Sequence, residues 1–323
     1  MNPTSYKYAI KDCDVTDKPA LERFRAKRSE WLDWLRHDEH HAITLSICSL
    51  VWNDVSFRVL ARAGETNEEG ALGNSLIAEA LIEGHIAIQT LAIRRLMDDR
   101  KSGVISLANL LKDIDRNVGL FTRENFVAFD GLPYDCETAR KRVVTAQLVA
   151  GNSTFWAARH GPDAYSPSQQ AHETFDRISG VDPANRQRLD RIPTRHVKTL
   201  RRWLTETNAG SIVDWTDNFL AHAAGRHRRH RVDLAAIQPT LDKITAVTRT
   251  FARVSEVVLA YLLFDGGLGN VMPVAQYDEL EQLDRPAITA KQASDLTKRW
   301  NVMENERNEF AAGVLEEILA VPS

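Results

Sequence analysis

The spacing of apolar residues is that of α-helices in nearly every long segment of the chain. The clearest case is a seam with three or four residues between its members, which predicts one long helix: Leu241, Ile244, Val247, Phe251, Val254, Val258 and Tyr261. Pro239 stands near the start of this helix and Gly266-Gly267 after its end, as is typical of helix boundaries. Sustained alternation of apolar and polar residues, which would indicate strands, does not occur. The pattern therefore predicts an all-α bundle.

Helix-start signals support the same fold class. Asp17, followed by Lys18-Pro19, is a capping residue with an early proline, and an apolar stripe begins at Leu21. Ser106 is placed to cap a short helix with an apolar stripe of its own: Leu107, Leu110, Leu111 and Ile114. Residues 42–60 are apolar on more than one face, which predicts a buried helix.

The helical pattern also predicts an organisation along the chain. We expect an N-terminal tail over 1–18, a helical domain over 19–270 and an acidic C-terminal helical extension over 271–323. Within the domain, residues 130–184 contain several glycine and proline breaks on either side of a helical run over about 137–159, and predict an inserted irregular region. The apolar residues Leu315, Ile318 and Leu319 place a helix in the extension.

Composition narrows the class of protein without naming a function. The 323 residues are 43% hydrophobic and 26% charged, which is typical of globular proteins. Three cysteines far apart in the chain argue against a disulfide scaffold and favour a reducing compartment. The most apolar run, Val254 to Phe264, contains Glu256 and is too short to span a bilayer. We therefore expect a soluble, cytoplasmic protein without membrane contact.

The net charge of −3 hides an uneven distribution. Residues 186–231 contain eleven Lys and Arg against four Asp and Glu, a local charge of +7 that leaves −10 for the rest. A basic face on an acidic molecule can bind a phosphate backbone, and such binding weakens as salt is added. The alternative is a solvated surface, in which 226–231 neutralise a helix C-terminus.

A histidine lies inside this basic stretch, on a predicted short helix over 211–224. Ile212, Trp215, Phe219 and His222 share one face, and Asn218 precedes His222 by one turn. A histidine oriented in this way can act as a general acid–base group. The alternative is a boundary histidine whose hydrogen bonds are satisfied within the fold.

Other chemical motifs are sparse. The phosphate-binding, dinucleotide-binding and common hydrolase motifs are absent, and no cofactor is indicated. His37 and His41 are four residues apart on one predicted helix face and could share a metal ion, but no third ligand is identifiable. We therefore predict no metal site and interpret this cluster as a polar helix junction.

Two segments resemble a known family. The run Asp217-Asn218-Phe219-Leu220-Ala221-His222, which opens onto the basic stretch, resembles HEPN domains of the abortive-infection type. The segment 86–114, with Arg94-Arg95-Leu96 and then Ser106-Leu107, resembles the helices that precede that motif. The resemblance covers about 21–268, and residues 130–182 match poorly. It implies a helical bundle, usually dimeric, in a family with many metal-independent ribonucleases.

The resemblance implies roles for particular residues. His222 matches the family's acid–base histidine, and Asp217 or Asn218 matches the polar residue that follows the family's arginine. That arginine should stand at 215–217, where this chain has Trp, Thr and Asp. We expect phosphate contacts instead from basic residues on either side of the motif: Arg226, Arg228 and Arg229 after it, and Arg94 and Arg95 on the earlier matched helix.

Three functional hypotheses follow. The first is an RNA-binding HEPN-like protein, either a metal-independent ribonuclease or a degenerate form, from a toxin or phage-defence system; it implies a homodimer and an antitoxin-like protein partner. The second is a noncatalytic all-α protein–protein interaction module whose charged regions dock partner proteins or a second copy. The third is a small-molecule or metal enzyme that uses His37 and His41.

Overall fold

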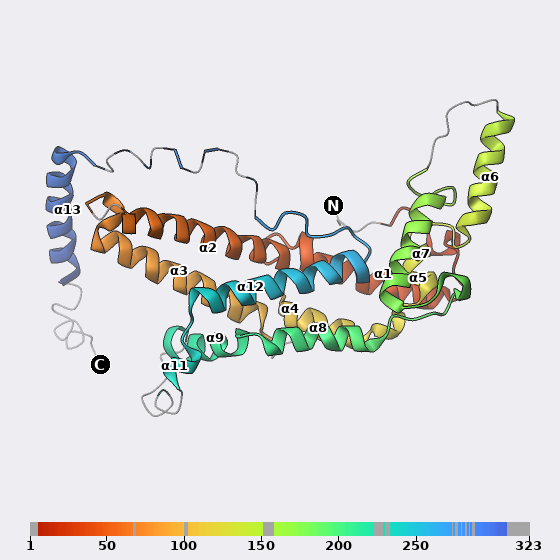
Figure 1. Ribbon diagram of the computed structural model, residues 1–323, viewed down its shortest axis with the longest axis horizontal. Coiled ribbons are helices and arrows are strands. Elements are labelled where there is room, and N and C mark those ends of the chain that lie inside the picture. The colour runs from red at the N-terminus through yellow and green to blue at the C-terminus, as the bar shows by residue number, and fades with distance from the viewer. Residues whose placement is uncertain are drawn as a thin grey trace, which may run out of the picture. The chain divides into compact units, whose positions relative to one another are not determined.

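A computed structural model (Figure 1) describes residues 6–66, 69–99, 103–150, 158–221, 229, 233–272, 274, 277–278, 280–281, 283, 285 and 288–308. The chain forms two compact units: unit 1 comprises Met1–Val59 and Leu81–Val274, and unit 2 comprises Leu60–Ala80 and Ala275–Ser323. Within the described ranges every regular element is a helix, which confirms the all-α prediction. An isolated β-bridge joins Thr122 and Arg191.

The α-helices are α1 (Lys18–Leu32), α2 (Ile43–Thr66), α3 (Ser75–Leu96), α4 (Leu107–Arg116), α5 (Arg123–Ala128), α6 (Cys136–Val149), α7 (Tyr165–Ser179), α8 (Thr194–Glu206), α9 (Ala209–Trp215), α11 (Leu234–Ile237), α12 (Leu241–Glu256) and α13 (Ala290–Asn308). Wider π-helical turns continue α1 over Asp33–His37, α9 over Thr216–Leu220 and α12 over Val257–Leu262. Single 3₁₀ turns lie at Ile10–Asp12, Ala71–Gly73, Val118–Leu120 and Pro183–Asn185.

The helix starts predicted from the sequence are confirmed by their caps. The carboxylate of Asp17 accepts a hydrogen bond from the Ala20 amide at the start of α1. The hydroxyl of Ser106 accepts from the Asn109 amide at the start of α4. Each cap satisfies a backbone N–H that the helix itself leaves unpaired. The seam from Leu241 onward forms α12 and its π-helical turn, as predicted.

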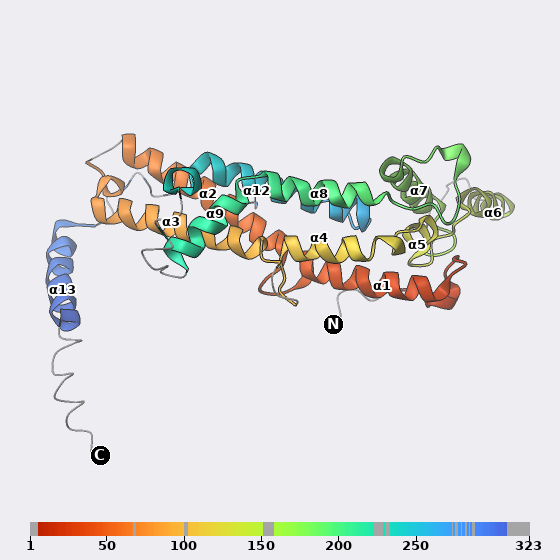
Figure 2. The same ribbon diagram turned by 90° about the horizontal axis from the view of Figure 1, so that it is seen from below.

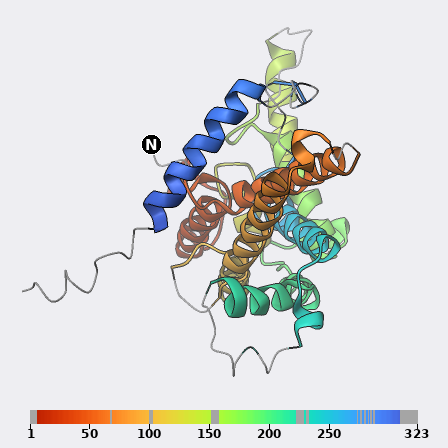
Figure 3. The same cartoon turned by 90° about the vertical axis from the view of Figure 1, so that its left-hand side faces the viewer.

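Unit 1 is built around one apolar interior. Helices α1, α4 and α8 lie side by side in Figure 2, and the end-on view of Figure 3 shows α12 in the same group. Trp31 on α1 is fully buried, stacks on Phe121 with ring centroids 5.4 Å apart, and donates its indole N–H to Asp113 on α4. A buried indole that finds both an aromatic and a hydrogen-bond partner holds α1 firmly against α4.

Residues 130–184 are more regular than the sequence suggests. Outside the gap at 151–157 they contain the helices α6 and α7, and α7 buries Ala171 and Phe175 in the unit 1 interior. One of the prolines that suggest breaks in the sequence stands at a helix start: Pro167 is the third residue of α7, where its missing N–H costs nothing. Gly180 ends α7 in the left-handed conformation that glycine tolerates.

The prediction of a buried helix over 42–60 is correct only for its beginning. In α2 the buried residues are Ile43, Ser46, Ile47 and Leu50, and none of the described residues after them is fully buried. Both α2 and α3 are long and apolar enough to cross a membrane by length and composition, with 22% of the apolar window of each buried. The apolar run 254–264, from which a soluble protein is predicted, belongs to neither helix, so cytoplasmic location stays a prediction.

Unit 2 contains the end of α2, the beginning of α3 and helix α13. The turn between the first two brings the Leu72 carbonyl so close to Gly64 that a Cβ atom there would lie 2.9 Å from its oxygen, which explains the glycine. Helix α13 exposes Leu296, Trp300 and Val302. The helix predicted around residues 315–319 lies outside the described residues.

Candidate functional site

The two segments that carry the family resemblance meet in unit 1. Arg94 belongs to the last turn of α3, and its Nε atom pairs with Oδ1 of Asp217 in the π-helical turn after α9. The Arg94 side chain is 23% exposed and that of Asp217 is 11% exposed, so the pair lies at the edge of the core, with a partly exposed arginine on a buried aspartate. Both residues make further interactions besides this one. The fold thus places an arginine beside the polar turn whose own sequence lacks one.

The π-helical turn determines which residues of the motif face inward. Thr216 is fully buried, and its hydroxyl donates to the Ile212 carbonyl at 2.7 Å. This back-bond and the complete burial leave no room at 216 for a long arginine side chain. A π-helical turn inserts one extra residue into a helix and is frequent at functional sites. Here it buries Thr216, Asp217 and Asn218 in succession.

Asn218 has one satisfied and one unsatisfied side-chain atom. Its Nδ2 donates to the Asp214 carbonyl one turn earlier at 2.7 Å. Its Oδ1 is buried without a hydrogen-bond partner in the described part of the chain. A buried acceptor in this state is costly, so it marks a place where a donor is needed. The predicted contact with His222 lies outside the described residues, as do Arg226 and Arg228.

Arg95 is held by a different set of residues. Its guanidinium donates to the Ser46 hydroxyl on α2 and lies 3.3 Å from Nδ1 of His41. A cation beside that ring opposes metal binding there, and the part of the chain that the structure describes contains no group of three metal-ligating side chains. The hypothesis of a metal enzyme based on His37 and His41 gains no support. Arg94 and Arg95 therefore do not form one binding group.

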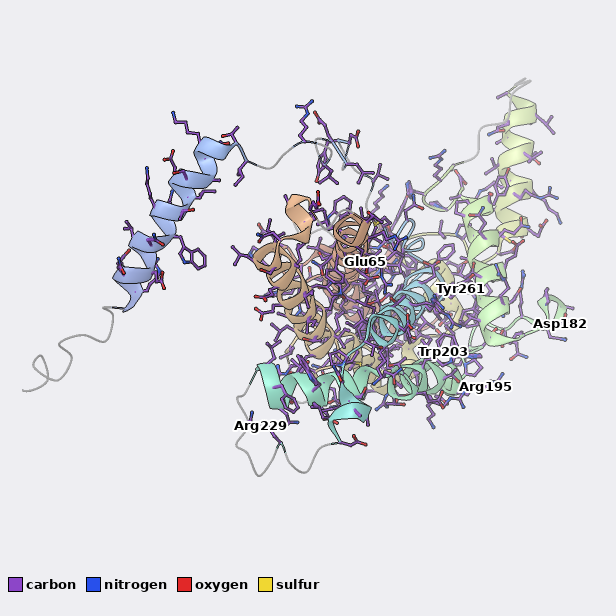
Figure 4. The ribbon with its side chains drawn as sticks, turned by 60° about the vertical axis from the view of Figure 1, so that its left-hand side comes forward. Glu65, Asp182, Arg195, Trp203, Arg229 and Tyr261 are labelled. Atoms are coloured by element: carbon purple, nitrogen blue, oxygen red, sulfur yellow. The ribbon has the colours of Figure 1, made fainter. Side chains whose placement is uncertain are left out.

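Much of the basic segment is already neutralised. Four of its arginines form ion pairs: Arg186 with Asp176, Arg188 with Asp14, Arg201 with Asp115 and Arg202 with Glu206. Three of these four acidic partners lie outside the segment. Four basic residues have no acidic partner among the described residues: Arg191, Arg195, Lys198 and Arg229. Figure 4 labels Arg195 and Arg229 and shows them at opposite ends of the row formed by α8 and α9. The free positive charge is smaller and more spread out than the local charge of +7 suggests.

A second arginine–aspartate cluster was not foreseen from the sequence. Arg123 is fully buried and donates to Asp176 Oδ1 at 2.6 Å and to Asp190 Oδ2 at 2.8 Å. Its guanidinium also lies 4.6 Å from the centre of the Phe175 ring. Burial raises the pKa of the Asp176 carboxyl, but hydrogen bonds from Arg186 and Arg123 outweigh burial and hold the pKa below its ordinary value. The sequence feature that could have revealed this cluster is a pair of charged residues inside the apolar stretch 121–129.

Comparison of the chain with protein-family models, curated proteins and solved structures finds no match. The HEPN resemblance therefore rests on the two short motifs, and the interpretation of the site rests on its own geometry. That geometry brings the partly exposed guanidinium of Arg94 on α3 to the carboxylate of Asp217, next to an Asn218 amide oxygen that has no partner among the described residues.

Proposed function

We propose that the protein binds RNA through the π-helical turn Thr216–Leu220 and the end of α3, as a HEPN-like protein. One observation carries the proposal: Arg94 reaches the turn from another helix and supplies a cation where the family's motif arginine is missing. An arginine at this place can bind a phosphate group through two of its N–H donors. The contact with Asp217 keeps the guanidinium in place until a phosphate competes for it.

The same arrangement supports metal-independent cleavage as the activity. His222 would accept the proton of an RNA 2′-hydroxyl as the 2′-oxygen attacks the adjacent phosphorus. The new P–O2′ bond forms while the P–O5′ bond breaks, and the leaving 5′-oxygen takes a proton from water. The products are a 2′,3′-cyclic phosphate and a 5′-hydroxyl. Arg94 would neutralise charge on the phosphate during the attack.

The unpaired basic residues suggest how a longer strand would run. Arg229 follows α9, and Arg195 and Lys198 lie on α8, all without an acidic partner in the described ranges. A strand held at the π-helical turn can continue along this row of helices and meet isolated cations rather than one dense patch. Such a surface predicts few phosphate contacts and a modest salt dependence.

The test measures binding and cleavage of a labelled single-stranded RNA in EDTA at two salt concentrations. We expect Arg94→Ala to weaken binding at least tenfold, because a charge-assisted contact of about 1.5–3 kcal/mol is lost. His222→Ala should abolish cleavage while the RNA stays bound. Arg140→Ala is the matched control, because Arg140 is an exposed arginine on α6 whose ion pair, with Glu137, lies on the same helix. Equal binding by the Arg94 and Arg140 variants contradicts the proposal.

The proposal extends to the cellular role that the resemblance implies. A ribonuclease of a toxin or phage-defence system would arrest growth when expressed and would need an antitoxin-like protein partner. We expect expression of the intact chain to slow bacterial growth and His222→Ala to relieve the effect. Growth arrest that persists in the His222 variant excludes cleavage as its cause.

A noncatalytic interaction module is the second candidate, and a specific observation favours it. Helices α2 and α3 expose large apolar side chains within unit 1: Leu45, Val55, Val59, Ile82, Ile88 and Leu91. Exposed apolar residues in such number are typical of surfaces that associate with another protein, a second copy included. Sedimentation analysis of the parent protein and of the Ile88→Glu and Leu91→Glu variants separates the two candidates. A parent protein that dimerises through these residues but does not bind RNA would leave only the interaction module.

A further inference from the structure

A cavity of about 340 Å³ lies in unit 1 between α2 and α12, away from the residues assigned above. Its walls are mainly apolar and come from Val51 and Val55 on α2, Ala252 on α12, and Val271 after it. Four side chains that line it carry polar atoms: Asp54, Thr245, Thr248 and Arg249. A mostly apolar cavity of this size with a few polar groups is typical of small-molecule sites.

Thr248 differs from the other threonines of its helix. Thr245 and Thr250 donate their hydroxyls to the carbonyls of Leu241 and Ala246, one turn earlier, at 2.9 and 3.0 Å. Thr248 is 7% exposed, yet its Oγ1 has no hydrogen-bond partner among the described residues. Its hydroxyl is therefore left to act as both donor and acceptor at the cavity wall.

Asp54, which lines the same cavity, has a carboxylate oxygen without a hydrogen-bond partner among the described residues. Its Oδ2 accepts from Arg58 Nε at 2.9 Å, whereas its Oδ1 is buried without a hydrogen-bond partner in the described part of the chain. Nε2 of His85 lies 3.9 Å from Oδ1, beyond hydrogen-bond distance. The other ring nitrogen of His85 faces Asn53 Oδ1 at 3.0 Å, an oxygen that also accepts from Gln89.

These contacts determine the protonation of His85. Because Asn53 Oδ1 is an acceptor, His85 Nδ1 carries the proton and Nε2 presents a lone pair. Burial lowers the pKa of His85, against the opposing effect of the Asp54 charge, so the ring is neutral at pH 7. His85 therefore offers Asp54 Oδ1 no proton, and the oxygen needs a donor from elsewhere.

The charges around the cavity select a neutral ligand. Arg58 compensates the Asp54 carboxylate, and the exposed Arg249 also lines the cavity, which disfavours a cation. The free carboxylate oxygen disfavours an anion. We propose that this cavity binds a small neutral alcohol with an apolar body, whose hydroxyl donates to Asp54 Oδ1 and accepts from Thr248.

The test uses phenol and anisole, which differ in whether the oxygen carries a proton. Titration of the full chain, followed by calorimetry or ligand-detected NMR, should show that phenol binds about three- to tenfold more tightly than anisole. This difference in affinity is the one expected for a single hydrogen bond. Thr248→Val keeps the side-chain shape and should reduce that preference by a similar factor. Thr250→Val is the matched control, because the Thr250 hydroxyl donates to a carbonyl of its own helix and Thr250 does not line the cavity.

Several outcomes overturn the proposal. The cavity is not a ligand site if neither probe binds at millimolar concentration and a crystal structure shows ordered water molecules alone bound to Asp54 and Thr248. Equal affinities of phenol and anisole remove the role of the hydroxyl. Ala252→Phe, with its fold verified by circular dichroism, should fill the cavity and abolish binding of both probes; undiminished binding places the site elsewhere. Arg94→Ala should leave phenol binding unchanged, so this test is independent of RNA binding.

Discussion

Two arginine–aspartate clusters in unit 1 use the same chemistry in opposite environments. Arg123 is fully buried, pairs with Asp176 and Asp190, and lies against an aromatic ring. Arg94 is partly exposed and pairs with Asp217 at the edge of the π-helical turn. The first cluster joins α5 to α7 and to the loop before α8, whereas the second is within reach of solvent and of a ligand.

The difference shows what distinguishes a structural pair from a candidate site. A buried pair cannot exchange its partners, because each charge without water would be uncompensated. A partly exposed pair gains little from its own attraction and can give up one partner to a phosphate at small cost. Asn218, next to Asp217, supports the same distinction, because its buried Oδ1 has no hydrogen-bond partner among the described residues, whereas a purely structural turn would bury that oxygen paired.

The largest expected effect comes from the buried cluster. Arg123→Met keeps most of the side-chain volume but removes the charge that Asp176 and Asp190 share. We expect the free energy of unfolding to fall by about 3–5 kcal/mol, because two aspartates lose their buried partner. Urea unfolding followed by circular dichroism measures the change. Arg140→Met, at an exposed pair, should lower the free energy of unfolding by less than about 1 kcal/mol. Equal losses in the two variants would show that burial does not cause the large loss expected for Arg123→Met.

Acid should act on the same cluster in a defined direction. The pKa of Asp176 in the folded protein lies below its ordinary value of 3.8, so the unfolded chain takes up this proton at higher pH than the folded chain does. The stability from Asp176 is therefore complete above about pH 4 and is lost as the pH falls through the folded-state pKa. Urea midpoints from pH 6 to pH 2.5 measure the loss.

Asp176→Asn provides the comparison for that titration. At pH 7 the variant should be less stable by about 1.5–3 kcal/mol, since hydrogen bonds from Arg123 and Arg186 to a charged acceptor become bonds to a neutral one. Its stability should fall less steeply with acid than that of the parent protein. Parallel pH profiles of the two proteins would remove Asp176 from the acid response.

The sequence predicted the local parts of the fold better than the tertiary ones. The starts of α1 and α4 follow from Asp17 and Ser106, because a cap depends on residues three positions away. The packing of α7 did not follow, because Pro167 marks a helix start or a break with equal ease in the sequence. Whether α7 packs on the domain depends on Phe175 and on partners far along the chain.

The sequence also predicts the local features of the candidate site better than its tertiary contacts. Asp217 and Asn218 could be named from their spacing to His222, and Arg94 from a second motif. That Arg94 rather than Arg95 pairs with Asp217 depends on the rotation of α3, which no local pattern determines. The local charge of +7 misled for the same reason, since the acids that neutralise Arg186 and Arg201 belong to other parts of the chain.

The exposed cluster should respond in function more than in stability. Arg94→Gln removes the charge opposite Asp217 and should lower the free energy of unfolding by about 1 kcal/mol or less, because the pair is partly solvated. The same variant should weaken RNA binding about tenfold, as a phosphate contact is lost. Urea unfolding and RNA titration on one preparation compare the two effects. A stability loss as large as that of Arg123→Met would make this pair structural too.

The smallest expected effect tests whether paired arginines of the basic segment are held back from RNA. Arg201 on α8 pairs with Asp115 at 2.7 Å, and its side chain is 46% exposed. Asp115→Asn should change the free energy of unfolding by less than about 1 kcal/mol, since exposed ion pairs contribute little. It frees one cation beside Lys198, so RNA should bind more tightly at low salt. The slope of log affinity against log salt should steepen by about 0.7, the value for one further phosphate contact on a single strand.

Glu137→Gln, which frees Arg140 on α6 instead, should leave the slope unchanged, because that arginine lies away from the row of α8 and α9. An identical slope for Asp115→Asn and the parent protein would mean that RNA does not follow α8.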